Sequence, residues 1–183
     1  MQIMKCRFKV SIDKDLNSPI NTFLLRWNPA ISSYTMEQFD SDMEDYAHYE
    51  YWDDFNWSVH EWEKAQDGDR FFMLRVGEGK TGIFAAGHFI SDPFKGEDWS
   101  GKGREVYYMT MEFEALFHPE RTEIITTEEL QRALPNIDWE KGHSGELITT
   151  EDAECLNKMW NEHIKKHAEA FRPRAVMNTK YIE

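Results

Sequence analysis

Residues 70–90 constrain the fold most, because they have the pattern of one tight β-hairpin with two strongly apolar arms. The first arm, 70–76, is apolar on both faces, which is typical of a strand buried inside a sheet. Residues 77–80 carry the turn glycines, and 82–90 form the returning strand. The small residues at 85–87 allow another group to approach the backbone closely. The chain is therefore predicted to fold around a β-sheet.

Three further segments have strand patterns. Residues 23–27 read as a short buried strand that stops at Asn28-Pro29, and residues 6–12 alternate as a half-buried strand does. Residues 105–114 show the clearest alternation. The side chains predicted to share one face there are Tyr107, Met109, Met111 and Phe113.

Helical patterns lie between and after these strands. In the acidic segment 35–56, apolar residues recur at helical spacing (Met36, Phe39, Met43 and Tyr46-Ala47), which predicts an amphipathic helix with a solvated acidic face. Thr126 and Glu129 form a capping box that opens a helix over 127–134. Thr149 begins a longer helix, which the segment 172–174 is expected to close. Its apolar stripe comprises Ala153, Leu156, Trp160, Ile164 and His167.

The segments 49–57 and 94–103 are predicted as loops, and 172–183 as a tail. Antiparallel strands interrupted by helices, without regular βαβ alternation, indicate the α+β class. The 183 residues are 40% hydrophobic and contain no Pro/Gly/Ser linker, so we expect one domain over 1–183.

Composition argues for a cytoplasmic protein without a metal or other cofactor. No window has the roughly 18 apolar residues of a membrane helix, and 1–10 lacks a signal-peptide core. Cys6 and Cys155 are far apart and are expected to be reduced thiols. The seven His residues show no metal-ligand spacing.

The net charge of −13 opposes nucleic-acid binding, which depends on Lys and Arg. The charge is segregated, however. Eight acids and no Lys or Arg fall in 35–56, whereas 70–104 has six basic residues against four acids and 164–180 has five against one. A local basic surface therefore remains possible.

Enzyme motifs are absent: the sequence has no G-x-S-x-G, no P-loop and no dinucleotide fingerprint. Ser58 near His60 is weak evidence for a nucleophile and base. Tryptophan is abundant instead, with seven residues, of which Trp160 is assigned to the core. Trp27, Trp57 and Trp99 lie at strand ends or in loops, where either core packing or stacking on a planar base would explain them.

The order of motifs resembles the EVE-like domain of the PUA superfamily, which is often fused to HNH nucleases. The resemblance covers roughly residues 22–166. The motifs that carry it are 23–29 (FLLRWNP), 56–58 (NWS), 67–75 (DGDRFFMLR), 82–87 (GIFAAG), 92–94 (DPF), Trp99, Trp139 and 143–145 (HSG). Val59-His60 stands where HNH-associated relatives often have Cys-Gly.

The resemblance implies a small, strongly curved antiparallel β-barrel with flanking helices and a pocket for a modified or flipped base. The related YTH domains read methylated adenine in RNA and carry a similar Trp-Ser pair. Trp57 would then be a wall of the cage, Ser58 a polar contact and Trp99 a second wall.

The resemblance also places Trp27 and Asn28 at the end of the first pocket strand, with Ser144 and Gly145 in the loop that faces it. Asn28 could equally cap its own turn.

The candidates for phosphate contact are Arg75, Lys102 and Arg104, although a strand salt bridge would explain Arg75 equally well. Our leading hypothesis is a non-catalytic reader of a modified base in DNA or RNA. A second is a protein-interaction module that binds a basic partner through 36–55. A hydrolase or nuclease has the least support.

Overall fold

The computed structural model describes residues 20–49, 55–167 and 170; the expected strand at 6–12, Cys6 and the tail lie outside them. Cys155 is a free thiol. The elements in chain order are β1 Thr22–Trp27, α1 Met36–Tyr49, β2 Phe55–Ser58, η1 Trp62–Lys64, β3 Arg70–Arg75, β4 Gly82–Phe89, β5 Phe94–Gly96, β6 Val106–Leu116, β7 Ile125–Thr126, α2 Thr127–Ala133, β8 Glu146–Leu147 and α3 Thr150–Lys166.

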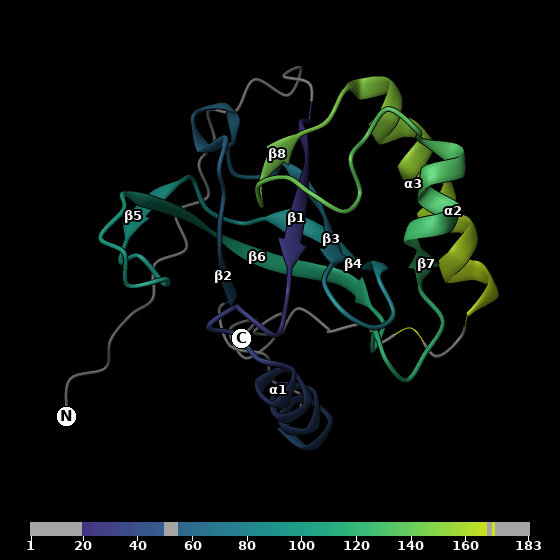
Figure 1. Cartoon of the computed structure of the whole chain (residues 1–183), viewed down its shortest axis with the longest axis horizontal. Helices are drawn as coiled ribbons and strands as arrows, with labels where there is room; N and C mark the ends of the chain where they lie inside the picture. The colour runs from purple at the N-terminus through teal and green to yellow at the C-terminus, as the bar shows by residue number, and fades with distance from the viewer. Residues whose placement is uncertain (1–19, 50–54, 168–169, 171–183) are drawn as a thin grey trace, which may run out of the picture.

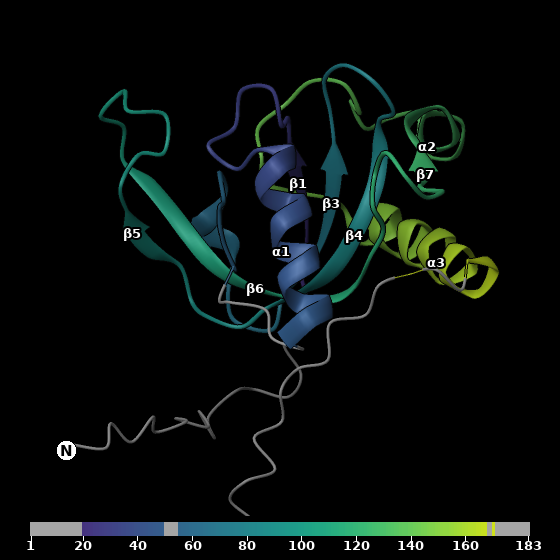
Figure 2. The same ribbon diagram turned by 90° about the horizontal axis from the view of Figure 1, so that it is seen from below.

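One mixed sheet organises the molecule, in the order β2-β6-β4-β3-β1-β8, with β5 paired to β6 and β7 paired to β4. β1 runs parallel to β3, and the other pairs are antiparallel. The sheet curls into a half-barrel with helices beside it (Figures 1 and 2). The resemblance implied that all strands would be antiparallel, and this was wrong for the pair β1 and β3. The long connection from β1 to β3, which contains α1 and β2, allows those two strands to run parallel.

The predicted hairpin is confirmed as β3 and β4. Register shifts interrupt the pairing between Met73 and Leu74 and again between Ala86 and Gly87. A Cβ atom at Gly87 would lie 1.9 Å from the Glu112 carbonyl oxygen, so the close approach of β6 requires glycine there. Such bulges increase local twist, which helps the sheet to curl.

The helices pack onto the sheet through aromatic side chains. Phe39 of α1 contacts Trp27 and Phe84, with ring centroids 5.4 and 5.9 Å away respectively. Trp160 of α3 meets Phe72 and Phe117 edge to face. In Figure 1, α1 lies beyond the end of β1, whereas α2 and α3 lie beside β4 and β7. The apolar stripes predicted for α1 and α3 are thus the surfaces through which these helices pack against the sheet.

Several boundaries differ from the sequence predictions, and three of these differences change an element. Phe55–Ser58 forms β2 rather than a loop, because it pairs with residues 108–111 of β6. Phe94–Gly96 forms β5 for the same reason, since it pairs with 106–108. Helix α3 ends at Lys166 instead of continuing to 172–174. The capping box of Thr126 and Glu129 is confirmed, with both hydrogen bonds formed.

Candidate nucleic-acid interface

Trp57 and Ser58 point to opposite faces of the sheet, because successive side chains in a strand alternate. Trp57 pairs with the buried Met109, whereas Ser58 pairs with the half-buried Tyr108. Trp57 is 9% exposed, so its ring belongs largely to the core. The two residues that the resemblance assigns to one pocket therefore face different environments.

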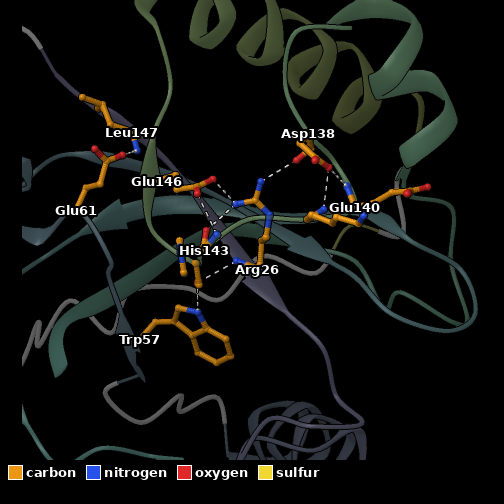
Figure 3. Close-up of polar contacts among 10 residues, drawn as sticks. Arg26, Trp57, Glu61, Asp138, Glu140, His143, Glu146 and Leu147 are labelled. Atoms are coloured by element: carbon orange, nitrogen blue, oxygen red, sulfur yellow. Dashed lines mark hydrogen bonds and ion pairs between the residues drawn. The ribbon is translucent and has the colours of Figure 1, made fainter. Parts of the chain in front are cut away.

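The Trp57 indole is held by Ser144, which is 87 residues away in sequence (Figure 3). Its Nε1 donates to the Ser144 hydroxyl at 2.9 Å, and the Arg26 backbone N–H donates to the same oxygen at 3.0 Å. Gly145 has a φ of +85°, and a Cβ there would lie 2.5 Å from the Val59 Cα. The loop containing Ser144 and Gly145 therefore packs directly against the segment that follows Trp57.

Arg26 holds the same loop from the other side. Its Nη1 donates to the His143 carbonyl at 2.6 Å and to Glu146 at 2.8 Å, and its Nη2 donates to the Asp138 carbonyl at 2.8 Å. The guanidinium thus connects β1 to three residues of the segment 138–146. Gly142, with φ +130°, lies so close to this guanidinium that a Cβ there would be 2.8 Å from its central carbon.

An aromatic cluster surrounds Trp57. Phe55 is nearly parallel to it at 5.7 Å, and Tyr34 meets both rings edge-on. The Tyr34 hydroxyl donates to Asp42 at 2.6 Å. Burial raises the pKa of Tyr34, and the bond to the Asp42 carboxylate raises this pKa further. Tyr34 is therefore a neutral donor at physiological pH, and the cluster is mainly apolar.

Hydrogen bonds to the Asp98 carboxylate hold the loop between β5 and β6. Its oxygens accept hydrogen bonds from the backbone N–H groups of Ser100, Lys102 and Arg104, at 3.0–3.1 Å. The Arg104 guanidinium adds a further bond at 3.1 Å. The side-chain bonds to Arg104, followed by its backbone bond, hold the pKa of Asp98 far below its usual range. The carboxylate is therefore ionised, and it fixes the shape of 98–104.

This loop presents Trp99 to solvent. Trp99 is 42% exposed, and the Arg104 guanidinium lies over its ring, 5.8 Å from the centroid. Phe94 is 40% exposed and stacks on Tyr108, whose hydroxyl donates to the Glu97 carbonyl. Tyr108 pairs with both Phe94 and Ser58, so these three side chains share one face of the sheet. We call Ser58, Phe94, Trp99, Tyr108 and Arg104 the aromatic platform.

Trp27, Asn28 and Arg75, which were also singled out from the sequence, are not part of this surface. Trp27 is fully buried, and its Nε1 donates to the Tyr34 carbonyl at 2.7 Å. The Asn28 side chain accepts from the N–H of Ala30 at 3.1 Å, so it caps its own turn. The Arg75 side chain is 6% exposed and pairs with Glu120 at 3.2 Å, as a strand salt bridge would. Lys102 and Arg104 are exposed and belong to the Trp99 loop.

Sequence reasoning missed Arg26, Asp98, Phe94 and Tyr108. Asp98 could have been found, because an Asp followed by Ser and two glycines in a short loop is typical of a side chain that bonds nearby backbone N–H groups. Phe94 and Tyr108 become neighbours only when β5 pairs with β6. The role of Arg26 depends on a loop more than 110 residues away.

Some acidic side chains of α1 form hydrogen bonds with other residues of the protein. Asp40 accepts from His118 at 2.6 Å and from Arg121 at 3.1 Å, and Asp42 bonds Tyr34. The remaining described acids of α1, Glu37, Glu44 and Asp45, are exposed. The predicted solvated acidic face is therefore present but smaller than the sequence indicated.

Within the described part of the chain, no three His, Cys, Asp or Glu side chains converge on a point that could hold a metal ion. None of the helices described there is both long and apolar enough to cross a bilayer.

Comparison with known proteins identifies the fold alone. No family model matches the sequence, and no curated protein matches it. A hypothetical protein from Leishmania major superposes with a TM-score of 0.51 at 10% identity, covering 79% of this chain and 97% of that one. The Mmi1 YTH domain in complex with RNA gives a TM-score of 0.48 at 11% identity, covering 80% of each chain.

A crystal structure of the same YTH domain gives 0.44 at 11% identity, covering 80% of this chain and 99% of that one. The match to the Leishmania major protein shows a shared α+β fold. The TM-scores for the YTH domain are too low to carry an argument, and the EVE-like family remains a prediction.

Proposed function

We propose that this domain binds single-stranded nucleic acid without catalysing a reaction, and that it reads an unpaired, modified base at the aromatic platform. The observation that carries the proposal is the Trp99 loop. An exposed indole lies under the Arg104 guanidinium in a loop that Asp98 holds, and the exposed Phe94 ring stacks on Tyr108 in the adjoining strands. Proteins that bind single strands combine such rings, on which bases stack, with nearby positive charge.

The platform is better suited to bases than to phosphates. Asp98 and Glu105 pair with Arg104 and Lys95, so much of the local positive charge is already neutralised. Affinity should therefore come mainly from stacking, and it should be modest and detectable at low salt. Ser58, which shares this face with Tyr108, would hydrogen-bond the edge of a stacked base.

Substitution of Trp99 by Ala tests the proposal. Fluorescence anisotropy with short single-stranded RNA and DNA, with and without one N6-methyladenine or 5-methylcytosine, would measure affinity at low salt. Loss of one stacked base should weaken binding by about 1–3 kcal/mol, or about five- to 150-fold. The melting temperature should not change, because the ring is exposed.

The matched control is Ile31→Ala, which also removes an exposed apolar side chain but lies outside the platform. Its affinity should equal that of the unmodified protein. Equal affinity of Trp99→Ala and the unmodified protein, or no binding of any oligonucleotide at low salt, would overturn the proposal. A preference for one modified oligonucleotide would identify the base that is read.

A further inference from the structure

The face of the sheet that carries the aromatic platform continues as an uncharged row of side chains. Ile90 lies one residue past the end of β4, and its N–H donates to the Thr110 carbonyl at 2.9 Å. Phe89 precedes Ile90 and is buried, so Ile90 points to the platform side of the sheet. Asn56 pairs with Thr110 and precedes the buried Trp57, so it points the same way. Ile90, Thr110 and Asn56 thus lie side by side across three strands, and we call them the second row.

Both ends of the second row are open to solvent. Ile90 is 48% exposed, and Asn56 is exposed as well. The Thr110 hydroxyl donates to the Asn56 Oδ1 at 2.8 Å. This bond orients the carboxamide and leaves its N–H₂ group, which carries two donors, for a ligand. The second row therefore offers an apolar side chain at one end and hydrogen-bond donors at the other.

The second row lies directly beside the aromatic platform. Tyr108 of the platform and Thr110 are two residues apart in β6, so the rows that contain them are about 6.8 Å apart. On the other side of the second row, β6 presents the exposed carboxylate of Glu112, opposite His88 of β4. A phosphate would be repelled by Glu112, whereas an uncharged base would not. The position and the charge of the second row therefore suit a base that neighbours one on the platform.

We infer that the second row binds the base next to the one on the aromatic platform, so that the protein recognises two neighbouring bases of a single strand. The inference rests on the proposed function, because the first base must lie on the platform. Ile90 covers part of the face of the second base, and the Asn56 N–H₂ group donates to its edge. Each of the four bases has acceptors, so this contact adds affinity without selecting one base. β-Sheet surfaces of RNA-binding domains hold two or three consecutive bases in this way.

Short DNA strands with abasic sugars at most positions test the inference, because they differ in their bases but not in their charge. Fluorescence anisotropy at low salt would compare a strand with one adenine, a strand with two adjacent adenines and a strand with two adenines held three abasic sugars apart. The adjacent pair should bind at least about fivefold more tightly than the single adenine, which is the lower end of what one stacked base contributes. The separated pair should show a much smaller gain.

Two variants locate the second base through the ratio of the affinities for the adjacent pair and the single adenine. Ile90→Ala and Asn56→Asp each change an exposed side chain, so both should lower this ratio without changing the melting temperature. The matched control Ile31→Ala, which changes another exposed Ile, should leave the ratio as it is. Equal affinity for the single and the adjacent adenines, or an unchanged ratio in both variants, would overturn the inference and leave the proposed function standing. Failure of every strand to bind, with or without abasic sugars, would overturn both.

Discussion

At Trp57 the indole is 9% exposed and donates its N–H to Ser144, whereas at Trp99 the indole is 42% exposed and lies under the Arg104 guanidinium. Tryptophan therefore has two different roles in this molecule. A buried ring contributes packing and a satisfied hydrogen bond, and an exposed ring leaves a face open for a ligand. The Trp57 ring is largely buried because β2 carries it to the same face as the buried Met109.

Truncation of Trp57 should therefore destabilise the protein. We expect Trp57→Ala to lower the free energy of unfolding by about 3–5 kcal/mol, because it leaves a large cavity and removes one of the two hydrogen bonds that the Ser144 hydroxyl accepts. Trp99→Ala removes the same atoms from an exposed site and should cost less than about 0.5 kcal/mol. Urea denaturation of the two variants measures the difference. Similar stabilities would mean that the Trp57 ring is not packed as described.

Asp98 should control the loop that carries Trp99. Its pKa is lowered in the folded protein, so its contribution is present above its ordinary pKa of about 3.9 and is lost only as pH falls through the lower folded value. Trp99 quenching by acrylamide should therefore stay constant from neutral pH down to about pH 5. Asp98→Asn should raise the quenching at every pH, since an amide cannot replace the ionised acceptor. Unchanged quenching in Asp98→Asn would show that the glycines alone shape the loop.

At the scale of elements, α3 shows how a helix is joined to the sheet. Its N-cap, Thr149, accepts the N–H of Asp152 at 3.1 Å, and its stripe buries Ala153, Leu156 and Trp160. Trp160 makes edge-to-face contacts with a ring from β3 and with Phe117, which directly follows β6. A single residue therefore connects the helix to two parts of the fold.

We expect Trp160→Ala to reduce the free energy of unfolding by about 3–5 kcal/mol, which would unfold a marginally stable domain. Trp160→Phe should cost less, because most of the packing survives and the buried indole N–H has no hydrogen-bond partner to lose among the described residues. Thermal denaturation of both variants measures this order. An unchanged melting temperature in Trp160→Ala would contradict the docking of α3.

At the scale of the whole molecule, the net charge of −13 opposes association with a polyanion, and the exposed face of α1 contributes to it. Deletion of the acidic segment would not isolate this effect. Phe39 of α1 is buried against Trp27, so removal of the helix would also remove part of the core. Neutral substitutions on the exposed face are the cleaner perturbation.

The triple variant Glu37→Gln, Glu44→Gln, Asp45→Asn should bind oligonucleotides several-fold more tightly at low salt, and the gain should fade at high salt as long-range repulsion is screened. Anisotropy titrations over a salt series measure it. Under the alternative hypothesis, in which the acidic segment binds a basic protein, the variant should instead lose affinity for a basic partner such as polylysine. Unchanged affinity for both ligands would assign the acidic face to neither function.

Local patterns in the sequence were sufficient for most of the elements. The hairpin at 70–90, the alternation over 105–114, the stripe of α3 and the capping box all arise from spacing within one element. The short strands β2 and β5 were not predicted, because their hydrogen-bond partners lie in β6. They have four and three residues respectively, which is too short for a strand pattern to be recognised from the sequence alone.

By itself, the sequence determined that the chain is α+β and where its helices begin. Only the tertiary structure decided which tryptophans are buried, that β1 runs parallel to β3, and that Arg26 holds the loop 138–146. The physical reason is that these outcomes depend on contacts between residues far apart in the sequence. Trp57 and Ser144, for example, are 87 positions apart, and the geometry of their contact is set by the curvature of the whole sheet.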